Sequence, residues 1–206
     1  MEKHDNYAIA SANARKLFLS YDQEALIRKL NLRYDDAWLY TRFFDRDYRI
    51  SRLTGNMERL EGAAWQSANG FHEVLTLMDL LCDSREDRHL SGRIRNMLDF
   101  GHQFHQTLLE ESRDPFAEKI QENPAAFAAA CGQMGGKERK GADAGFDIPV
   151  FQELSVTLLF WEGDEEFAPR LRFLWDENAL QYLKYETMYY AVNMIRSQLP
   201  QKPHHL

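Results

Sequence analysis

The chain has 206 residues, of which 44% are hydrophobic and 13% aromatic, enough to bury a substantial core and to exclude a wholly disordered protein. Its formal net charge is -7 and its pI about 5.5, so its surface repels phosphate backbones and we expect no nucleic-acid partner. No apolar run is long enough to cross a membrane and the N-terminus lacks the apolar region of a secretory signal, so we expect a cytoplasmic protein with no membrane partner.

The first part of the chain changes from helical to extended patterning. Residues 6–20 repeat apolar side chains at helical spacing, and Asp22 is a suitable N-cap for a second helix over Gln23–Leu30. Aromatic and β-branched residues then dominate residues 38–44 and 47–53, with turn residues between and after them. These patterns predict two amphipathic helices followed by two or three antiparallel strands.

The middle of the chain alternates helices with irregular stretches. Apolar residues between positions 71 and 81 fall at helical spacing, and Asn69 is a suitable cap for that helix. Residues 93–109 are expected to be either irregular or a helix interrupted by a glycine. Two short helices are predicted to begin at Pro115 and Pro124, because proline suits the first helical turn and each is preceded by Asp or Asn.

The last third of the chain predicts a β-hairpin followed by a helix over about residues 186–198. Ser155–Trp161 is apolar on both faces, which suits a central strand, whereas Arg170–Trp175 alternates and suits an edge or half-covered strand. We expect Trp161 and Trp175 to leave opposite or adjacent faces of this sheet, with at least one of them in the core.

Together these elements predict an α+β fold, in which a small, largely antiparallel sheet carries several packed helices. We expect residues 1–206 to form a single domain, with flexible ends at about 1–5 and 200–206. The Gly-rich stretch at about 135–145 is predicted to be a loop.

An acidic turn joins the two strands of the predicted hairpin. Glu162, Asp164, Glu165 and Glu166 surround Gly163, and two more acids follow the second strand. Such carboxylates attract Ca²⁺ and Mg²⁺, but their spacing is not that of an EF-hand loop. Turn geometry alone explains the Gly–Asp pair, so we expect no metal here. A metal site would need at least three of these acids to converge on one point.

The remaining reactive side chains form no recognisable catalytic motif. His102 and His105 lie one helical turn apart and are able to share a metal, but no third ligand follows in the pattern of a metalloenzyme. His72 suits the half-buried edge of a core. Cys82 and Cys131 fall in apolar helical patterns typical of buried thiols, and a disulfide between them is not demanded.

Aromatic residues are dense between Phe160 and Tyr190. Most of them suit a core, and the alternative is that they form the wall of a pocket for a flat ligand. We therefore hypothesise that a small molecule binds between the acidic WEGDEEF turn and the aromatic C-terminal segment, through Trp161, Glu162, Asp164, Glu165 and Glu166. The alternative is a non-catalytic protein–protein interaction module with an exposed apolar patch. The sequence identifies no reaction, cofactor or oligomeric state.

Several stretches carry a resemblance to a known family. The most specific is FWEGDEEFAP, followed by LWDENALQYL and YET, and similar stretches upstream include LFLSYDQEALIRKLNL and FFDRDYRISRLTG. They resemble an uncharacterised prokaryotic family, domain of unknown function 3786, over most of the chain. The resemblance implies a cytosolic bacterial or archaeal protein but no activity. Some relatives add a cysteine-rich iron–sulfur region, whose cysteines this chain lacks, so no electron-transfer role is implied.

Overall fold

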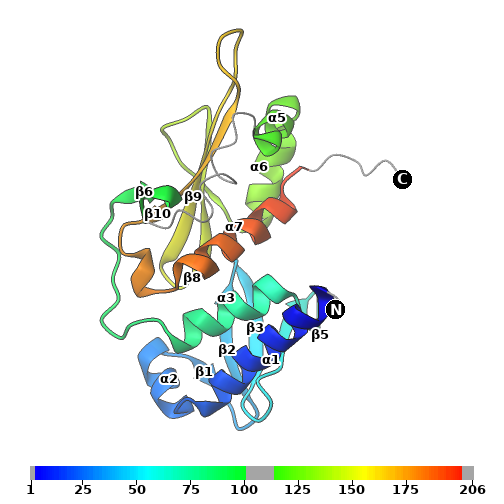
Figure 1. The fold of residues 1–206 in the computed structure, drawn as a ribbon, viewed down its shortest axis with the longest axis vertical. Coiled ribbons are helices and arrows are strands. Elements are labelled where there is room, and N and C mark those ends of the chain that lie inside the picture. The colour runs from blue at the N-terminus through cyan, green and yellow to red at the C-terminus, as the bar shows by residue number, and fades with distance from the viewer. Residues whose placement is uncertain (1–2, 101–113, 201–206) are drawn as a thin grey trace. The chain divides into compact units, whose positions relative to one another are not determined.

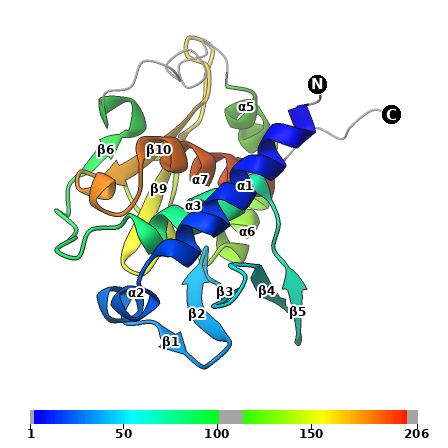
Figure 2. The same ribbon diagram turned by 60° about the horizontal axis from the view of Figure 1, so that its bottom comes forward.

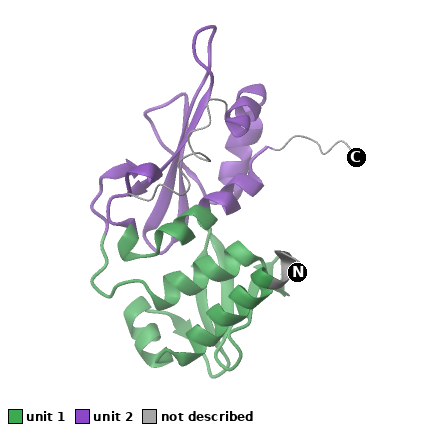
Figure 3. Ribbon diagram, viewed as in Figure 1, with its two compact units in different colours: residues 1–89, 180–191 green, residues 90–179, 192–206 purple. Residues whose placement is uncertain are grey.

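The computed structural model describes residues 3–100 and 114–200, and it confirms the predicted α+β class. The chain forms two compact units (Figure 3): residues 1–89 with 180–191, called unit 1, and residues 90–179 with 192–206, called unit 2. Helix α7 (Tyr185–Gln198) contributes residues to both units. The expectation that the whole chain is a single domain stays a prediction.

Unit 1 combines helices with a five-stranded sheet in which every neighbouring pair of strands is antiparallel. The strand order follows the chain, so each strand is connected directly to its neighbour. Its helices are α1 (Lys3–Ser20), α2 (Gln23–Leu30) and α3 (Phe71–Cys82), and its strands are β1 (Arg33–Tyr34), β2 (Trp38–Phe43), β3 (Arg46–Ser51), β4 (Met57–Glu61) and β5 (Ala64–Ser67).

The helices of unit 1 cover one face of its sheet (Figures 1 and 2). Helix α2 begins where predicted, because the Asp22 side chain accepts hydrogen bonds from the N–H groups of Glu24 and Ala25 at 3.0 and 3.1 Å. On the covered face, Leu39 and Ile50 face each other across β2 and β3 and are fully buried. The period-2 alternation that predicted strands therefore also marks the side of the sheet that packs on the helices.

A buried carboxylate links α3 to this sheet. Glu73 is only 7% exposed, and it accepts hydrogen bonds from the Tyr48 hydroxyl and the Arg59 guanidinium, both at 2.5 Å. Tyr48 lies on β3 and Arg59 on β4, so one side chain holds two strands against the helix. Burial and the neighbouring carboxylate raise the pKa of Tyr48, which keeps its hydroxyl protonated as a donor.

Unit 2 contains a second five-stranded antiparallel sheet, with strand order β6-β10-β9-β8-β7. Strand β9 is central and pairs with β10 through the predicted hairpin, in which Trp161 faces Arg170 and Val156 faces Trp175. The elements of this unit are β6 (Ile94–Asn96), a 3₁₀ turn (Met97–Phe100), α5 (Pro115–Glu122), α6 (Pro124–Gln133), β7 (Lys137–Glu138), β8 (Ala144–Phe151), β9 (Leu154–Trp161) and β10 (Arg170–Asp176).

The core of unit 2 lies between its sheet and its helices. Trp175 is fully buried and Trp161 only half-buried, and the pairing register puts them on opposite faces, as predicted. Both short helices begin at the predicted prolines, with Asp114 and Asn123 as capping side chains. Helix α5 contacts β10 and α6 contacts β8. Cys131 on α6 is a free, buried thiol, as is Cys82 in unit 1.

The structure corrects one predicted helix cap and decides between two alternatives for one strand. Helix α3 is preceded by Gly70, which has no capping side chain, so the predicted cap at Asn69 is wrong. Asn69 instead accepts a hydrogen bond from Arg15 at 2.8 Å and donates one to Ser67 at 2.6 Å. Strand β10 lies inside its sheet, so it is the half-covered strand of the two predicted alternatives and not an edge.

The stretch 135–145 is only in part the predicted loop. Lys137 and Glu138 form strand β7, which pairs with Asp147 and Phe146 of β8. The segment at 93–100 is irregular, with one short strand and a 3₁₀ turn, and the two histidines at 102 and 105 lie outside the described residues. None of the helices in the described part of the chain is both long and apolar enough to span a membrane.

We predict that replacing Trp175 by Ala destabilises the protein by about 3–5 kcal/mol, because it removes a fully buried side chain from the core of unit 2. Trp161→Ala is the control, since Trp161 lies half-exposed on the opposite face and should cost about 1 kcal/mol. Chemical denaturation measures both. If Trp175→Ala lowers the free energy of unfolding by less than about 1 kcal/mol, Trp175 is not part of the core of unit 2.

Candidate functional site

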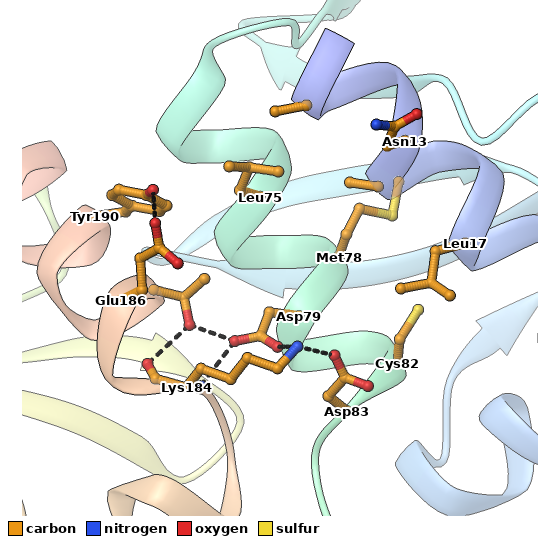
Figure 4. A pocket seen from close by; sticks show the side chains of 13 residues that line it. Asn13, Leu17, Leu75, Met78, Asp79, Cys82, Asp83, Lys184, Glu186 and Tyr190 are labelled. Atoms are coloured by element: carbon orange, nitrogen blue, oxygen red, sulfur yellow. Dashed lines mark hydrogen bonds and ion pairs between the residues drawn. The ribbon is translucent and has the colours of Figure 1, made fainter. Parts of the chain in front are cut away.

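Unit 1 has a pocket between α1, α3 and the beginning of α7 (Figure 4). Its volume is about 380 Å³, which is within the range of small-molecule sites. All its lining residues belong to unit 1: Ala10, Asn13, Ala14, Leu17, Leu75, Met78, Asp79, Cys82, Asp83, Lys184, Glu186, Thr187 and Tyr190.

One wall of the pocket is apolar. Helix α1 supplies Ala10 and Ala14, which are four residues apart and therefore lie on the same side of the helix. Because alanine side chains are short, they leave room between α1 and the facing residues Leu75 and Met78 of α3. Such a wall provides surface that a ligand can bury.

The opposite wall is charged. Asp79 lies on α3, and Asp83 follows one helical turn later as its C-cap residue. Lys184, which immediately precedes α7, reaches across to both (Figure 4). The Lys184 ammonium lies 3.1 Å from Oδ1 of Asp79 and forms a second ion pair with Asp83. Tyr21 donates a hydrogen bond to the other oxygen of Asp83 at 2.7 Å.

Asp79 also fixes the start of α7. Its Oδ2 accepts a hydrogen bond of 2.8 Å from the main-chain N–H of Lys184 and a second one from the Thr187 hydroxyl. The first N–H groups of a helix have no partner within the helix, so a carboxylate at this end both satisfies a donor and interacts favourably with the helix dipole. Asp79 is only 6% exposed, and removing it leaves the Lys184 N–H unpaired and the Thr187 hydroxyl with only the Lys184 carbonyl as acceptor.

The two carboxylates have opposite pKa shifts. Burial raises the pKa of Asp79. Burial alone would also raise the pKa of Asp83, but the hydrogen bonds from Lys184 and Tyr21 outweigh it and lower the pKa. The hydrogen bond to Asp83 in turn raises the pKa of Tyr21 to about 12. The surroundings thus move the pKa values of two neighbouring carboxyl groups apart.

Cys82 lines the pocket but is not an activated nucleophile. Burial raises the pKa of its thiol to about 12, so the thiolate is scarce at neutral pH. The nearby cation, Lys29, is engaged by main-chain oxygens, because its ammonium donates to the carbonyls of Cys82 at 3.0 Å and Ser84 at 2.9 Å.

Aromatic side chains border the pocket at its other end. Tyr190 lines it and donates a hydrogen bond of 2.5 Å to Glu186. The ring of Tyr190 stacks on His72, with centroids 4.9 Å apart, and meets Phe71 edge-on at 5.3 Å. His72 is thus half-buried, as the sequence indicated, and burial lowers its pKa.

The five ligand-binding residues predicted from the sequence lie in unit 2, and only two of them line the same surface pocket. Trp161 and Glu162 line a depression of about 360 Å³ together with Phe167, Ala168 and Arg170. The other three, Asp164, Glu165 and Glu166, are exposed and are not among its lining residues.

The acidic turn is built as turn chemistry predicts. The Asp164 side chain accepts hydrogen bonds from the N–H groups of Glu166 and Phe167, both at 2.8 Å. A Cβ at Gly163 would lie 2.6 Å from Pro169, so only glycine fits there.

Within residues 3–100 and 114–200 no three His, Cys, Asp or Glu side chains gather as a metal site requires. The two acids after β10 have other partners. Asp176 accepts hydrogen bonds from the N–H groups of Ser91 at 2.9 Å and Gly92 at 2.8 Å, and Glu177 pairs with Arg93 and Arg95.

Sequence reasoning missed Asp79, Asp83 and Lys184. One signal was present, because Asp79 interrupts the apolar run LTLMDLLC, and a carboxylate on the buried side of a helix is costly unless it has a partner or a function. Lys184 gave no such signal, since it lies 105 positions away along the chain.

We predict that Asp79→Ala destabilises the protein by about 3 kcal/mol at neutral pH, because the Lys184 N–H and the Thr187 hydroxyl lose their acceptor in a buried place. Chemical denaturation measures the change. A loss below about 1 kcal/mol would show that Asp79 does not hold α7.

Asp83→Asn is the matched control, with a pH-dependent effect of about 0.5–1 kcal/mol because Asp83 is exposed. The folded pKa of Asp83 is lowered, so its stabilisation is present above the unfolded value of about 3.9 and is lost as pH falls through the folded value. The stabilities of Asp83→Asn and the unsubstituted protein should therefore converge in acid. A difference that stays constant from neutral to acidic pH would contradict this assignment.

Comparison with known proteins agrees with the resemblance seen in the sequence. No curated protein and no solved structure matches the chain. A family model described as a domain of unknown function, DUF3786, matches residues 22–197, which include Asp79, Asp83 and Lys184 but not α1. This match takes in well over half of the sequence, and the chain therefore belongs to the DUF3786 family.

Proposed function

We propose that this protein binds a small organic molecule in the pocket between α1, α3 and α7. The observation that carries the proposal is a cavity of about 380 Å³ in which an apolar wall faces a pair of carboxyl groups with opposite pKa shifts. Carboxyl groups whose pKa values are shifted by burial and by specific partners, and which lie in a cavity, are typical of binding and catalytic sites.

The apolar wall and the charged wall would make different kinds of contact with a ligand. Leu75, Met78 and the two alanines of α1 offer apolar surface, worth about 25 cal/mol for each Å² that a ligand covers. Asp83 and Glu186 are exposed enough to meet a ligand directly. The Lys184 side chain is 64% exposed, so it is able to move away from the carboxylates when a ligand enters.

We predict that compounds that stabilise the protein in a thermal melt lose their effect when Ala14 is replaced by Leu, because the larger side chain fills the pocket. A ligand at 100 times its Kd should stabilise the unsubstituted protein by about 2.7 kcal/mol. Ala12→Leu is the matched control, since Ala12 is exposed on the same helix and does not line the pocket. The proposal fails if a diverse screen finds no stabilising compound, or if its hits stabilise the Ala14→Leu variant equally.

A second candidate function is supported by the hairpin of unit 2. The β9–β10 hairpin projects from the rest of its unit (Figure 1). In the turn between the two strands, Phe167 is 68% exposed. The turn is held in one shape by the Asp164 hydrogen bonds and by a 2.7 Å bond from the Gly163 N–H to Gln121. An ordered turn that presents an exposed aromatic side chain suits contact with a protein partner.

In this second function, the residues first selected from the sequence would act as contact residues. Trp161 and Glu162 would border the exposed Phe167, and Asp164, Glu165 and Glu166 would present negative charge beside it. Their number and sign suit a partner whose apolar hollow has a basic rim.

We predict that a photocrosslinking amino acid at position 167 captures a defined partner in cells, because this side chain is presented outward. Position 53 is the control, since Leu53 is 85% exposed in unit 1. Mass spectrometry of the crosslinked species compares the two. The same set of captured proteins at both positions would contradict a docking role for the hairpin.

A further inference from the structure

We propose that the ligand of the pocket between α1, α3 and α7 is an organic cation, namely a primary ammonium group carried by a compact apolar body. This inference rests on the proposed function, and it names the chemical class of the ligand. Three observations support it: the excess of carboxyl groups in the pocket, the Lys184 ammonium that the pocket already holds, and the surroundings of Glu186, which has no ion pair among the described residues.

The charged side chains that line the pocket are predominantly acidic. Asp79, Asp83 and Glu186 are carboxyl groups, and Lys184 is the one basic residue among the lining residues. If Asp79 keeps its proton, two carboxylates still face one ammonium. An anionic ligand would therefore meet net repulsion, whereas a cation would restore the balance.

Glu186 carries the charge that is not compensated. Within the described residues it forms no ion pair, and its one hydrogen bond there comes from the Tyr190 hydroxyl at 2.5 Å. Its place in the first turn of α7 suits the helix dipole, whose partial positive charge of about half an elementary charge is smaller than a full counter-charge. A carboxylate beside an aromatic ring is an arrangement that attracts organic cations.

Lys184 indicates where a ligand ammonium would lie. Its own ammonium is placed between Asp79 and Asp83, although most of its side chain is exposed. Oδ1 of Asp79 is 3.1 Å from this nitrogen yet accepts no well-aligned hydrogen bond, and Asp79 is more than nine-tenths buried. The site thus already binds an ammonium group, and Oδ1 of Asp79 is still able to accept a hydrogen bond from another one. A ligand ammonium would compete with Lys184 for this place.

The competitor role gives Lys184 a distinctive test. If Lys184 competes with the ligand, then Lys184→Met removes the competitor and an added amine should bind more tightly. If instead the Lys184 ammonium were the group that binds the ligand, as for an anionic ligand, the same substitution would abolish binding. The two assignments predict changes of opposite sign.

The experiment uses three probes of matched size: phenethylamine, 2-phenylethanol and 3-phenylpropionate. Isothermal titration calorimetry on the full chain is expected to give phenethylamine an affinity about tenfold above that of the alcohol, as one charge-assisted hydrogen bond provides. The carboxylate should not bind. Glu186→Gln should weaken binding of the amine severalfold more than binding of the alcohol, because glutamine still accepts the Tyr190 hydroxyl but carries no charge.

The outcomes separate this inference from the proposed function. Equal affinities for the amine and the alcohol, or tighter binding of the carboxylate, would overturn the cation assignment while leaving a binding pocket in place. Weaker amine binding by Lys184→Met would overturn it as well, provided that circular dichroism shows the variant folded. If no probe binds although other compounds stabilise the protein through the pocket, the amine class is wrong. If nothing binds at all, the proposed function fails with it.

Discussion

The buried carboxylate of Asp79 is the constraint on which the arrangement of unit 1 depends. It lies on α3 and accepts hydrogen bonds from the Lys184 N–H and the Thr187 hydroxyl at the beginning of α7. A buried carboxylate is costly to desolvate, so it persists only where donors surround it. Because those donors come from one helical end, the position of α7 on α3 is fixed, and with it the positions of Lys184, Glu186 and Tyr190 around the pocket.

Anchoring alone does not account for the rest of the site. The contacts of Asp79 Oδ2 explain how α7 is held, but they require neither a cavity nor further carboxyl groups around it. Asp83 adds an ion pair to Lys184 but no contact with the main chain of α7, and Glu186 makes no contact with Asp79. Together Asp83 and Glu186 make the pocket acidic. A simple helix–helix contact at this place would be filled by apolar side chains, which pack more favourably than unpaired charge. The excess of carboxylates is therefore the feature that a ligand best explains.

The sequence predicted what local interactions decide. The cap at Asp22, the helices that begin at Pro115 and Pro124, and the hairpin around Gly163–Asp164 each follow from neighbouring residues. Strand β8 escaped prediction because Gly145 and Pro149 interrupt its pattern, while its pairing with β9 is non-local. The pocket could not be predicted from the sequence for the same reason, since α1, α3 and Lys184 meet only in the folded unit. The acidic turn attracted attention through its composition, which turn chemistry explains.

Binding of an organic cation in this pocket can be followed through the methyl spectrum of methionine-labelled protein during titration with phenethylamine. Met78 lines the pocket, whereas Met57 lies buried in the sheet of the same unit and is not a lining residue. If the amine binds in this pocket, we expect a saturable shift of the Met78 methyl resonance, little change at Met57, and loss of the effect in the Ala14→Leu variant. A Met78 resonance that stays in place at saturating amine, or that moves equally with Met57, would contradict the claim that this pocket binds an organic cation.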